Sequence, residues 1–132
     1  MLRYGSPADI AHNLTEIGRV YGNLFLFPEA IEALNDAMQI SRDLGIREGT
    51  GRIGLFLARA YHGMGRNDRA LEVLPAAIED MEVIRFDRGL REAYRLRANL
   101  YRHEGQAERM AADRDRQGDR VLTDLDRADW MY

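Results

Sequence analysis

The chain repeats itself with a period of about 40 residues, and this feature constrains its fold more than any other. The pairs that a shift of one period aligns include Arg19 and Arg59, Tyr21 and Tyr61, Ala30 and Ala70, Leu34 and Leu74, and Ala37 and Ala77. A second shift places Ala98 after Ala58 and Tyr101 after Tyr61. Self-similarity at a fixed spacing is typical of stacked supersecondary units. The sequence therefore predicts a single repeat domain over residues 1–132.

Each repeat has the pattern of two helices. The apolar residues of the first expected helix are Ile10, Leu14, Ile17 and Tyr21. Steps of three and four residues are typical of a helix with one buried side. Ser6 followed by Pro7 is a typical helix start, and no alternating strand pattern occurs. We expect an all-α fold with helix pairs at about 8–45, 50–85 and 89–117, and a capping helix over 118–132.

The composition places the chain among folded domains. Of its 132 residues, 45% are apolar and 31% are charged, which is typical of a globular protein. The chain has no run of about 18 apolar residues, so the sequence predicts no membrane span. Residues 1–7 lack the apolar core of a signal peptide, so we expect a cytoplasmic location. With no cysteine, disulfides and thiolate catalysis are excluded.

The sequence lacks the motifs of common enzyme classes. A phosphate-binding loop needs a lysine, and all 19 basic residues are arginine. The three histidines are far apart, and no HExxH helix occurs. We therefore expect no enzyme, no cofactor and no metal site. A net charge of −3 argues against a nucleic-acid binder. Arginine forks suit carboxylates and phosphates, although codon bias in a GC-rich genome also explains the choice of arginine.

The pattern of small and large residues in the repeats resembles that of the tetratricopeptide repeat (TPR) family. The residues that carry the resemblance are Leu14, Ile17-Gly18, Tyr21, Ala30, Leu34 and Ala37 in the first unit, and Leu57-Ala58, Tyr61, Gly65, Ala70, Leu74 and Ala77 in the second. The resemblance implies a short right-handed solenoid of three helix-turn-helix repeats plus a C-terminal cap. The usual period in this family is about 34 residues. The longer period of this chain is similar to that of repeats in kinesin light chains, Pins-type adaptors and bacterial signalling regulators.

The resemblance also implies a function and a site. In this family the first helix of each pair lines a concave face that holds peptides or partner domains, so we expect a non-enzymatic adaptor. The implied groove residues are Arg19, Asn23, Arg52, Leu55, Phe56, Arg59, His62, Arg95, Asn99 and Arg102. Such a groove would bind an acidic segment with one apolar anchor, held by arginine forks and by Phe56. Alternatively, these arginines are solvated or paired with neighbouring acids.

Two other interpretations remain open at the level of sequence. The apolar residues Phe25, Leu26, Trp130 and Tyr132 would serve a self-associating scaffold such as a homodimer, or would instead cover the ends of the repeat array. Alternatively, the chain is a sensor or interaction module of a bacterial signalling or transcription regulator. None of these interpretations predicts direct contact with nucleic acid or with a membrane.

Overall fold

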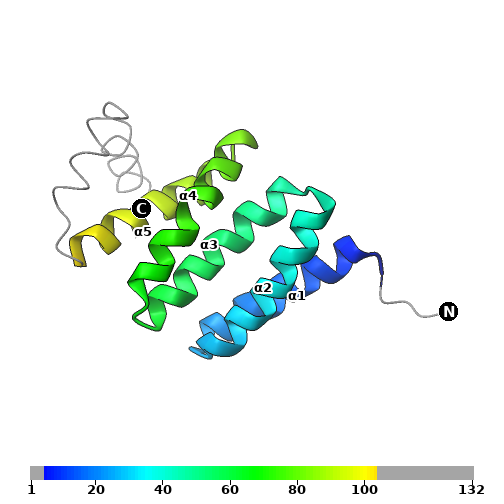
Figure 1. The fold of residues 1–132 in the computed structure, drawn as a ribbon, viewed down its shortest axis with the longest axis horizontal. Helices are drawn as coiled ribbons and strands as arrows, with labels where there is room; N and C mark the ends of the chain where they lie inside the picture. Colours follow the sequence, from blue (N-terminus) through cyan, green and yellow to red (C-terminus); the bar gives the residue numbers. More distant parts are fainter. Residues whose placement is uncertain (1–4, 104–132) are drawn as a thin grey trace.

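The sequence period becomes a row of helices in the computed structural model, which describes residues 5–103. The helices are α1 (Pro7–Asn23), α2 (Phe27–Leu44), α3 (Arg47–Gly63), α4 (Asn67–Val83) and α5 (Asp87–His103). No strand occurs among these residues, and Figure 1 shows the helices joined by short turns. The predicted all-α class is confirmed.

The helices start at a constant interval, which the sequence did not make obvious. Their first residues are 7, 27, 47, 67 and 87, so two equal steps make one period of the sequence. The connecting turns keep the same interval in their left-handed residues: Phe25 (φ 62°), Gly45 (φ 68°), Gly65 (φ 79°) and Arg85 (φ 58°). Every connection therefore uses one turn geometry, whether or not glycine occupies the left-handed position.

Local capping signals explain some helix ends but not others. At the start of α1, Asp9 N–H donates to Ser6 Oγ over 3.3 Å, and Ser6 N–H donates to Asp9 Oδ2 over 3.1 Å. This reciprocal pair is a capping box. Helix α4 begins at Asn67, after Arg66, and no side chain caps it. Asn67 Oδ1 instead lies 3.0 Å from His62 Nδ1.

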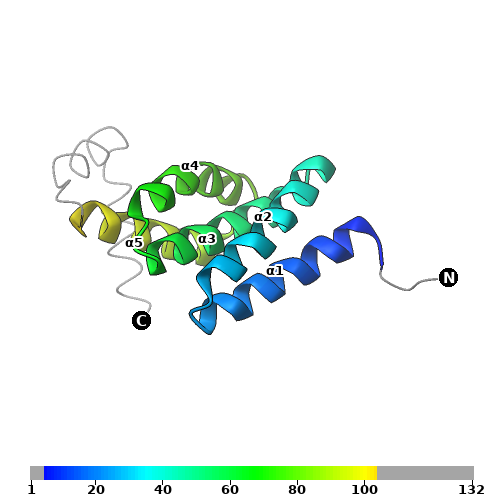
Figure 2. The same cartoon turned by 60° about the horizontal axis from the view of Figure 1, so that its bottom comes forward.

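The odd-numbered helices form one row and the even-numbered helices another. Each helix contacts its sequence neighbours, and α3 also contacts α1 on one side and α5 on the other. Helices α2 and α4 make no contact with each other. Figures 1 and 2 show α1, α3 and α5 side by side, with α2 and α4 crossing one surface of this row. The opposite surface of the row is left uncovered by α2 and α4.

Two apolar clusters hold the row together, and α3 belongs to both. One cluster joins α2 to α3 through Ala30, Leu34 and Ala37 on α2 and Ile53, Leu57 and Ala60 on α3. The other joins α3, α4 and α5, and its largest fully buried members include Leu74, Met81 and Leu100. Helix α3 therefore connects the two halves of the core.

The buried side of α1 differs from our expectation. Ile10 and Ile17 were expected to be buried, but they are 39% and 46% exposed. The residues that face the other helices are Ala11, Thr15 and Gly18, while Leu14 and Tyr21 pack partly against the α2–α3 cluster. Small residues permit close approach: a Cβ on Gly18 would lie 2.5 Å from Leu34 Cγ. The larger residues face outward because α1 is the first helix of the row.

Some expectations lie outside the described residues. These are the second helix of the third pair, over 105–117, and the cap, over 118–132. Within residues 5–103, no helix is long and apolar enough to cross a bilayer.

Candidate functional site

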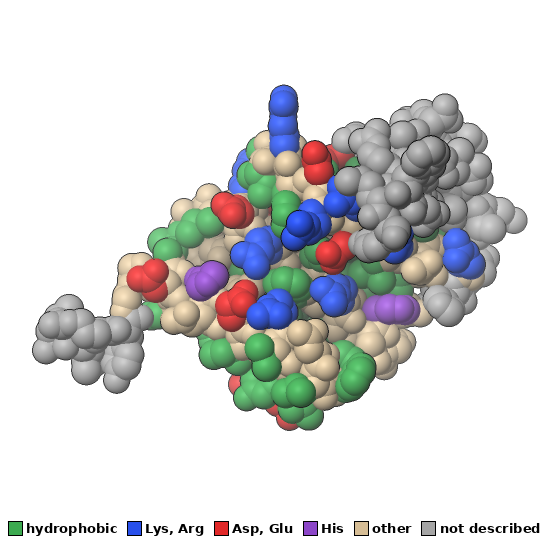
Figure 3. Space-filling model, turned by 180° about the vertical axis from the view of Figure 1, so that it is seen from behind, with side chains coloured by type: hydrophobic (Ala, Val, Ile, Leu, Met, Phe, Trp, Pro, Cys, Tyr) green, Lys and Arg blue, Asp and Glu red, His purple; other side chains and the backbone are tan. Residues whose placement is uncertain are grey.

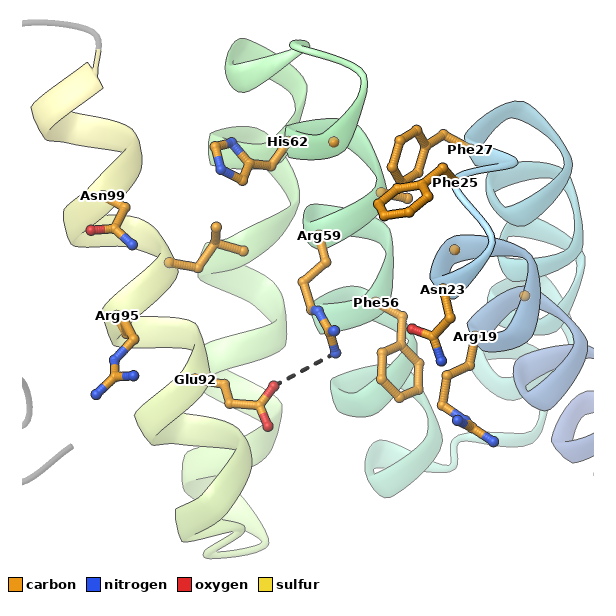
Figure 4. A pocket seen from close by; sticks show the side chains of 15 residues that line it. Arg19, Asn23, Phe25, Phe27, Phe56, Arg59, His62, Glu92, Arg95 and Asn99 are labelled. Carbon is orange, nitrogen blue, oxygen red and sulfur yellow. Dashed lines mark ion pairs between the residues drawn. The ribbon is translucent and has the colours of Figure 1, made fainter. Parts of the chain in front are cut away.

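A pocket of about 620 Å³ lies on the uncovered surface of α1, α3 and α5. It is lined by Gly18, Arg19, Gly22, Asn23, Phe25, Phe27, Phe56, Arg59, Ala60, His62, Gly63, Glu92, Arg95, Leu96 and Asn99. Figure 3 shows this surface with arginine side chains gathered around an apolar centre, and Figure 4 shows the pocket from close by. We call it the groove.

Seven of the ten predicted groove residues line it: Arg19, Asn23, Phe56, Arg59, His62, Arg95 and Asn99. They share one side of the odd-numbered helices because the repeat places them there. Arg19, Arg59 and Asn99 are successive copies of one position, and Phe56 and Leu96 are copies of another. Leu96 was not predicted, although a shift of one period from Phe56 points to it.

Phe56 lies in the middle of the groove between two guanidinium groups. The guanidinium carbons of Arg52 and Arg59 each lie 5.9 Å from its ring centroid. This distance allows cation–π attraction, which holds the cations beside the ring. The groove therefore has an apolar surface with positive charge on both sides. Arg52 takes part in this arrangement without lining the pocket.

Two glutamates partly neutralise the arginines. Arg19 Nη2 donates to Glu16 Oε1 over 2.9 Å, while the Arg52–Glu16 and Arg59–Glu92 ion pairs are 3.7 and 3.8 Å long. The longer distances exceed a hydrogen bond, so the guanidinium groups of Arg52 and Arg59 retain donors for a ligand. These three arginines share two glutamates, which leaves a local excess of positive charge. Figure 4 shows the Arg59–Glu92 pair across the groove.

Glu16 stays ionised in this setting. The hydrogen bond from Arg19 lowers the pKa of its carboxyl group, the positive charges of Arg19 and Arg52 lower it further, and burial opposes both effects. A bound carboxylate would compete with Glu16 for the same guanidinium groups. Glu16 is thus a built-in competitor for an anionic ligand.

Polar and aromatic side chains close one end of the groove. His62 and Asn99 lie on facing helices (Figure 4). Beside them, Phe25 and Phe27 meet edge to face, with centroids 6.0 Å apart. Gly63 makes room for this pair, since a Cβ there would clash with the Phe27 ring. Phe27 packs partly against the α2–α3 cluster and also lines the groove.

Three predicted groove residues do not line the pocket. Leu55 is only 4% exposed and packs into the α3–α4–α5 cluster, because its side of α3 faces the next repeat; that prediction is wrong. Arg102 is exposed and donates to Asn99 Oδ1 over 3.4 Å, so it reaches the groove only through Asn99. Arg52 lies over the Phe56 ring, with its guanidinium carbon 5.9 Å from the ring centroid.

Of the four apolar residues expected to serve self-association, the structure describes two. Phe25 is 78% exposed and Leu26 is 41% exposed, and Phe25 is also a groove residue. Trp130 and Tyr132 lie outside the described residues.

The described residues contain no group of three or more His, Cys, Asp or Glu side chains placed to hold a metal ion. Comparison of the chain with protein-family models, curated proteins and solved structures found no match.

Proposed function

We propose that the chain is a non-enzymatic, TPR-like adaptor whose groove binds an acidic peptide segment with one apolar anchor. The observation that carries this proposal is the placement of Phe56 between Arg52 and Arg59 beside a pocket of about 620 Å³. That volume lies within the range of ligand pockets, roughly 300–1,000 Å³. It accommodates a large side chain together with part of its backbone.

The chemistry of the groove selects the peptide. Guanidinium forks bind carboxylates through paired N–H donors, so acidic residues on the peptide would meet Arg19 and Arg59. The apolar anchor would pack among Phe56, Phe25 and Leu96, where burial of carbon surface favours binding. A basic peptide would meet the same positive charges and be repelled.

The test uses fluorescein-labelled peptides and fluorescence anisotropy with the full chain. One peptide carries a phenylalanine flanked by aspartates and glutamates; its comparators replace the phenylalanine by alanine, or all the acids by lysine. We expect the first peptide to bind, the alanine peptide to bind about tenfold more weakly, and the lysine peptide not to bind. Affinity for the first peptide should fall with salt, because exposed charge contacts are screened.

Two pairs of matched variants locate the contact. Arg59→Glu should weaken binding at least about tenfold, while Arg42→Glu, on α2 outside the groove, makes the same change in net charge and should leave binding unchanged. Glu16→Gln should strengthen binding a few-fold by removing the competitor of Arg19. Glu72→Gln is its control, because Glu72 pairs with Arg69 on α4 over 3.2 Å. Equal effects of Arg59→Glu and Arg42→Glu, or no binding of any peptide, would refute the proposal.

A further inference from the structure

The groove is open to solvent and carries positive charge that the described residues neutralise only in part. The side chains of Arg59 and Arg52 are 51% and 34% exposed, and their ion pairs with glutamates are 3.8 and 3.7 Å long. Phe56 lies between these two guanidinium groups. A ligand of the groove therefore has to supply carboxylates for the arginines and an apolar or aromatic group for the Phe56 ring.

The sequence after α5 contains one stretch that carries both kinds of group. Residues 119–132 have four aspartates against two arginines, together with Trp130 and Tyr132. The preceding stretch of equal length, residues 105–118, has three acids against three arginines and no aromatic residue. Net acidic charge and aromatic side chains therefore coincide in residues 119–132, which we call the acidic aromatic segment.

The order of residues within the acidic aromatic segment matches the chemistry of the groove. Asp126 and Asp129 precede Trp130 by four residues and by one residue, so carboxylates accompany the largest apolar side chain of the segment. An aromatic ring of this size buries more carbon surface than the other side chains of the segment. The segment thus has the composition of the peptide proposed above, an apolar anchor with acidic neighbours.

The acidic aromatic segment is tethered beside the groove. Helix α5 contributes Arg95 and Asn99 to the groove wall and ends at His103, one turn after Asn99. The fifteen residues from 104 to 118 span up to about 50 Å when extended and about 22 Å as a helix. Neighbouring helix axes lie about 8–10 Å apart, so in either form the tether is long enough to bring the segment to Phe56 on α3. Such a tether gives an effective concentration on the order of 1 mM.

We propose that the acidic aromatic segment of the same chain occupies the groove, with Trp130 on the Phe56 ring and the preceding aspartates on Arg59 and Arg52. This inference rests on the proposed function, because it gives the groove a ligand of the same chemistry. It adds that this ligand is part of the chain, so that an acidic partner peptide has to displace it. Burial of the indole ring and guanidinium–carboxylate contacts hold the segment, and the tether compensates for a weak intrinsic affinity.

Trp130 reports on this contact directly, because it is the only tryptophan in the chain. The test records its emission maximum in the full chain, together with the quenching of its fluorescence by acrylamide. We expect a blue-shifted and weakly quenched emission, since docking removes the indole ring from water. An unlabelled peptide with a phenylalanine flanked by aspartates and glutamates should shift the emission to that of an exposed tryptophan. This shift should occur over the same peptide concentrations as binding measured by fluorescence anisotropy.

A matched pair of groove variants locates the contact. Arg59→Glu should release Trp130 without any peptide, because it replaces a carboxylate-binding group by a carboxylate. Arg42→Glu makes the same change in charge on α2, outside the groove, and should leave the emission unchanged. The Arg59 side chain is half exposed, so its variant should keep the wild-type circular dichroism spectrum.

Variants of the segment should open the groove to the peptide. Trp130→Ala should lower the dissociation constant of the acidic phenylalanine peptide at least about threefold, because it removes a tethered competitor. Replacement of both Asp126 and Asp129 by asparagine should act in the same direction. The matched control replaces Asp113 and Asp115 by asparagine, in the stretch with balanced charge, and should leave the dissociation constant unchanged.

Three outcomes would overturn the inference. The first is the emission of a fully exposed tryptophan in the wild-type chain; if the peptide binds in the same sample, the proposed function stands. The second is a buried Trp130 that neither the peptide nor Arg59→Glu releases, which would place the segment on another surface. The third is burial of Trp130 that increases with protein concentration, which would assign the segment to the groove of a second copy. Absence of peptide binding to both the wild-type chain and Trp130→Ala would instead refute the proposed function, and this inference with it.

Discussion

At the scale of single residues, one buried arginine conflicts with its surroundings. Arg97 is 9% exposed, and its guanidinium carbon lies 5.3 Å from the Tyr94 ring centroid. Its Nη2 atom has no hydrogen-bond partner among the residues that the structure describes. The equivalent residue on α3 is Leu57, which packs in the α2–α3 cluster. The repeat therefore favours an apolar residue at a position where α5 carries a charge.

Replacing this arginine by an apolar residue of similar length should stabilise the protein. We expect Arg97→Met to raise the free energy of unfolding by about 1 kcal/mol, since removal of a buried, incompletely paired charge outweighs the lost cation–π contact. Urea denaturation followed by circular dichroism measures the change. Arg88→Met, at an exposed position on α5, is the control and should change stability by less than about 0.5 kcal/mol. A loss of stability in Arg97→Met would show that the guanidinium group has a stabilising partner.

At the scale of elements, the turns show what the repeat requires and what it tolerates. A shift of one period pairs Phe25 with Gly65 and Gly45 with Arg85, and all four residues adopt positive φ. Non-glycine residues are strained in this conformation. Phe25 is placed in the groove by its turn, which offers a reason for a large residue there. Within residues 5–103, no groove or core contact provides a comparable reason for Arg85, which is exposed.

Glycine at position 85 should therefore give a more stable protein than arginine. We expect Arg85→Gly to raise the free energy of unfolding by about 1 kcal/mol, because glycine adopts positive φ without a Cβ clash. The reverse change at the equivalent turn, Gly45→Arg, should lower it by a similar amount. Thermal unfolding of both variants checks the pair. If both substitutions shift the midpoint of unfolding in the same direction, backbone strain at positive φ does not decide whether glycine or arginine is more stable in these turns.

The sequence predicted most of the elements but not which side of each helix is covered. The period and the apolar spacing were sufficient to predict the five helices of residues 5–103, while the second helix of the third pair lies outside these residues. They misplaced Leu55 and Ile17, because apolar character alone does not show whether a side chain meets the groove, the next repeat or solvent. Leu55 is buried against the following helices, and Ile17 is exposed because nothing precedes α1 in the described row. The groove arginines were predicted through the family resemblance. The role of Glu16 as a competitor could be inferred only from its distances to Arg19 and Arg52 in the structure.

At the scale of the whole molecule, α3 connects the two apolar clusters of the core. It contacts each of the other four described helices, and its residues belong to both apolar clusters. A disturbance of α3 should therefore reach both halves of the core. In a repeat array, stability is a sum of units and of the interfaces between neighbours, and here α3 takes part in the interface on either side of its own unit.

Substitution by alanine should have opposite effects on stability at two glycines, Gly54 and Gly22. A Cβ on Gly54 would lie 2.6 Å from Ala77 Cβ, whereas a Cβ on Gly22 would have no atom within 4 Å. Since Ala77 Cβ is fixed to the α4 backbone, Gly54→Ala forces α3 and α4 apart, and we expect a loss of about 1–3 kcal/mol. Gly22→Ala should gain about 0.5–1 kcal/mol from helix propensity. Thermal unfolding followed by circular dichroism should give one shifted transition for each variant. Two separate transitions for Gly54→Ala would mean that the halves of the core unfold independently and that α3 does not couple them.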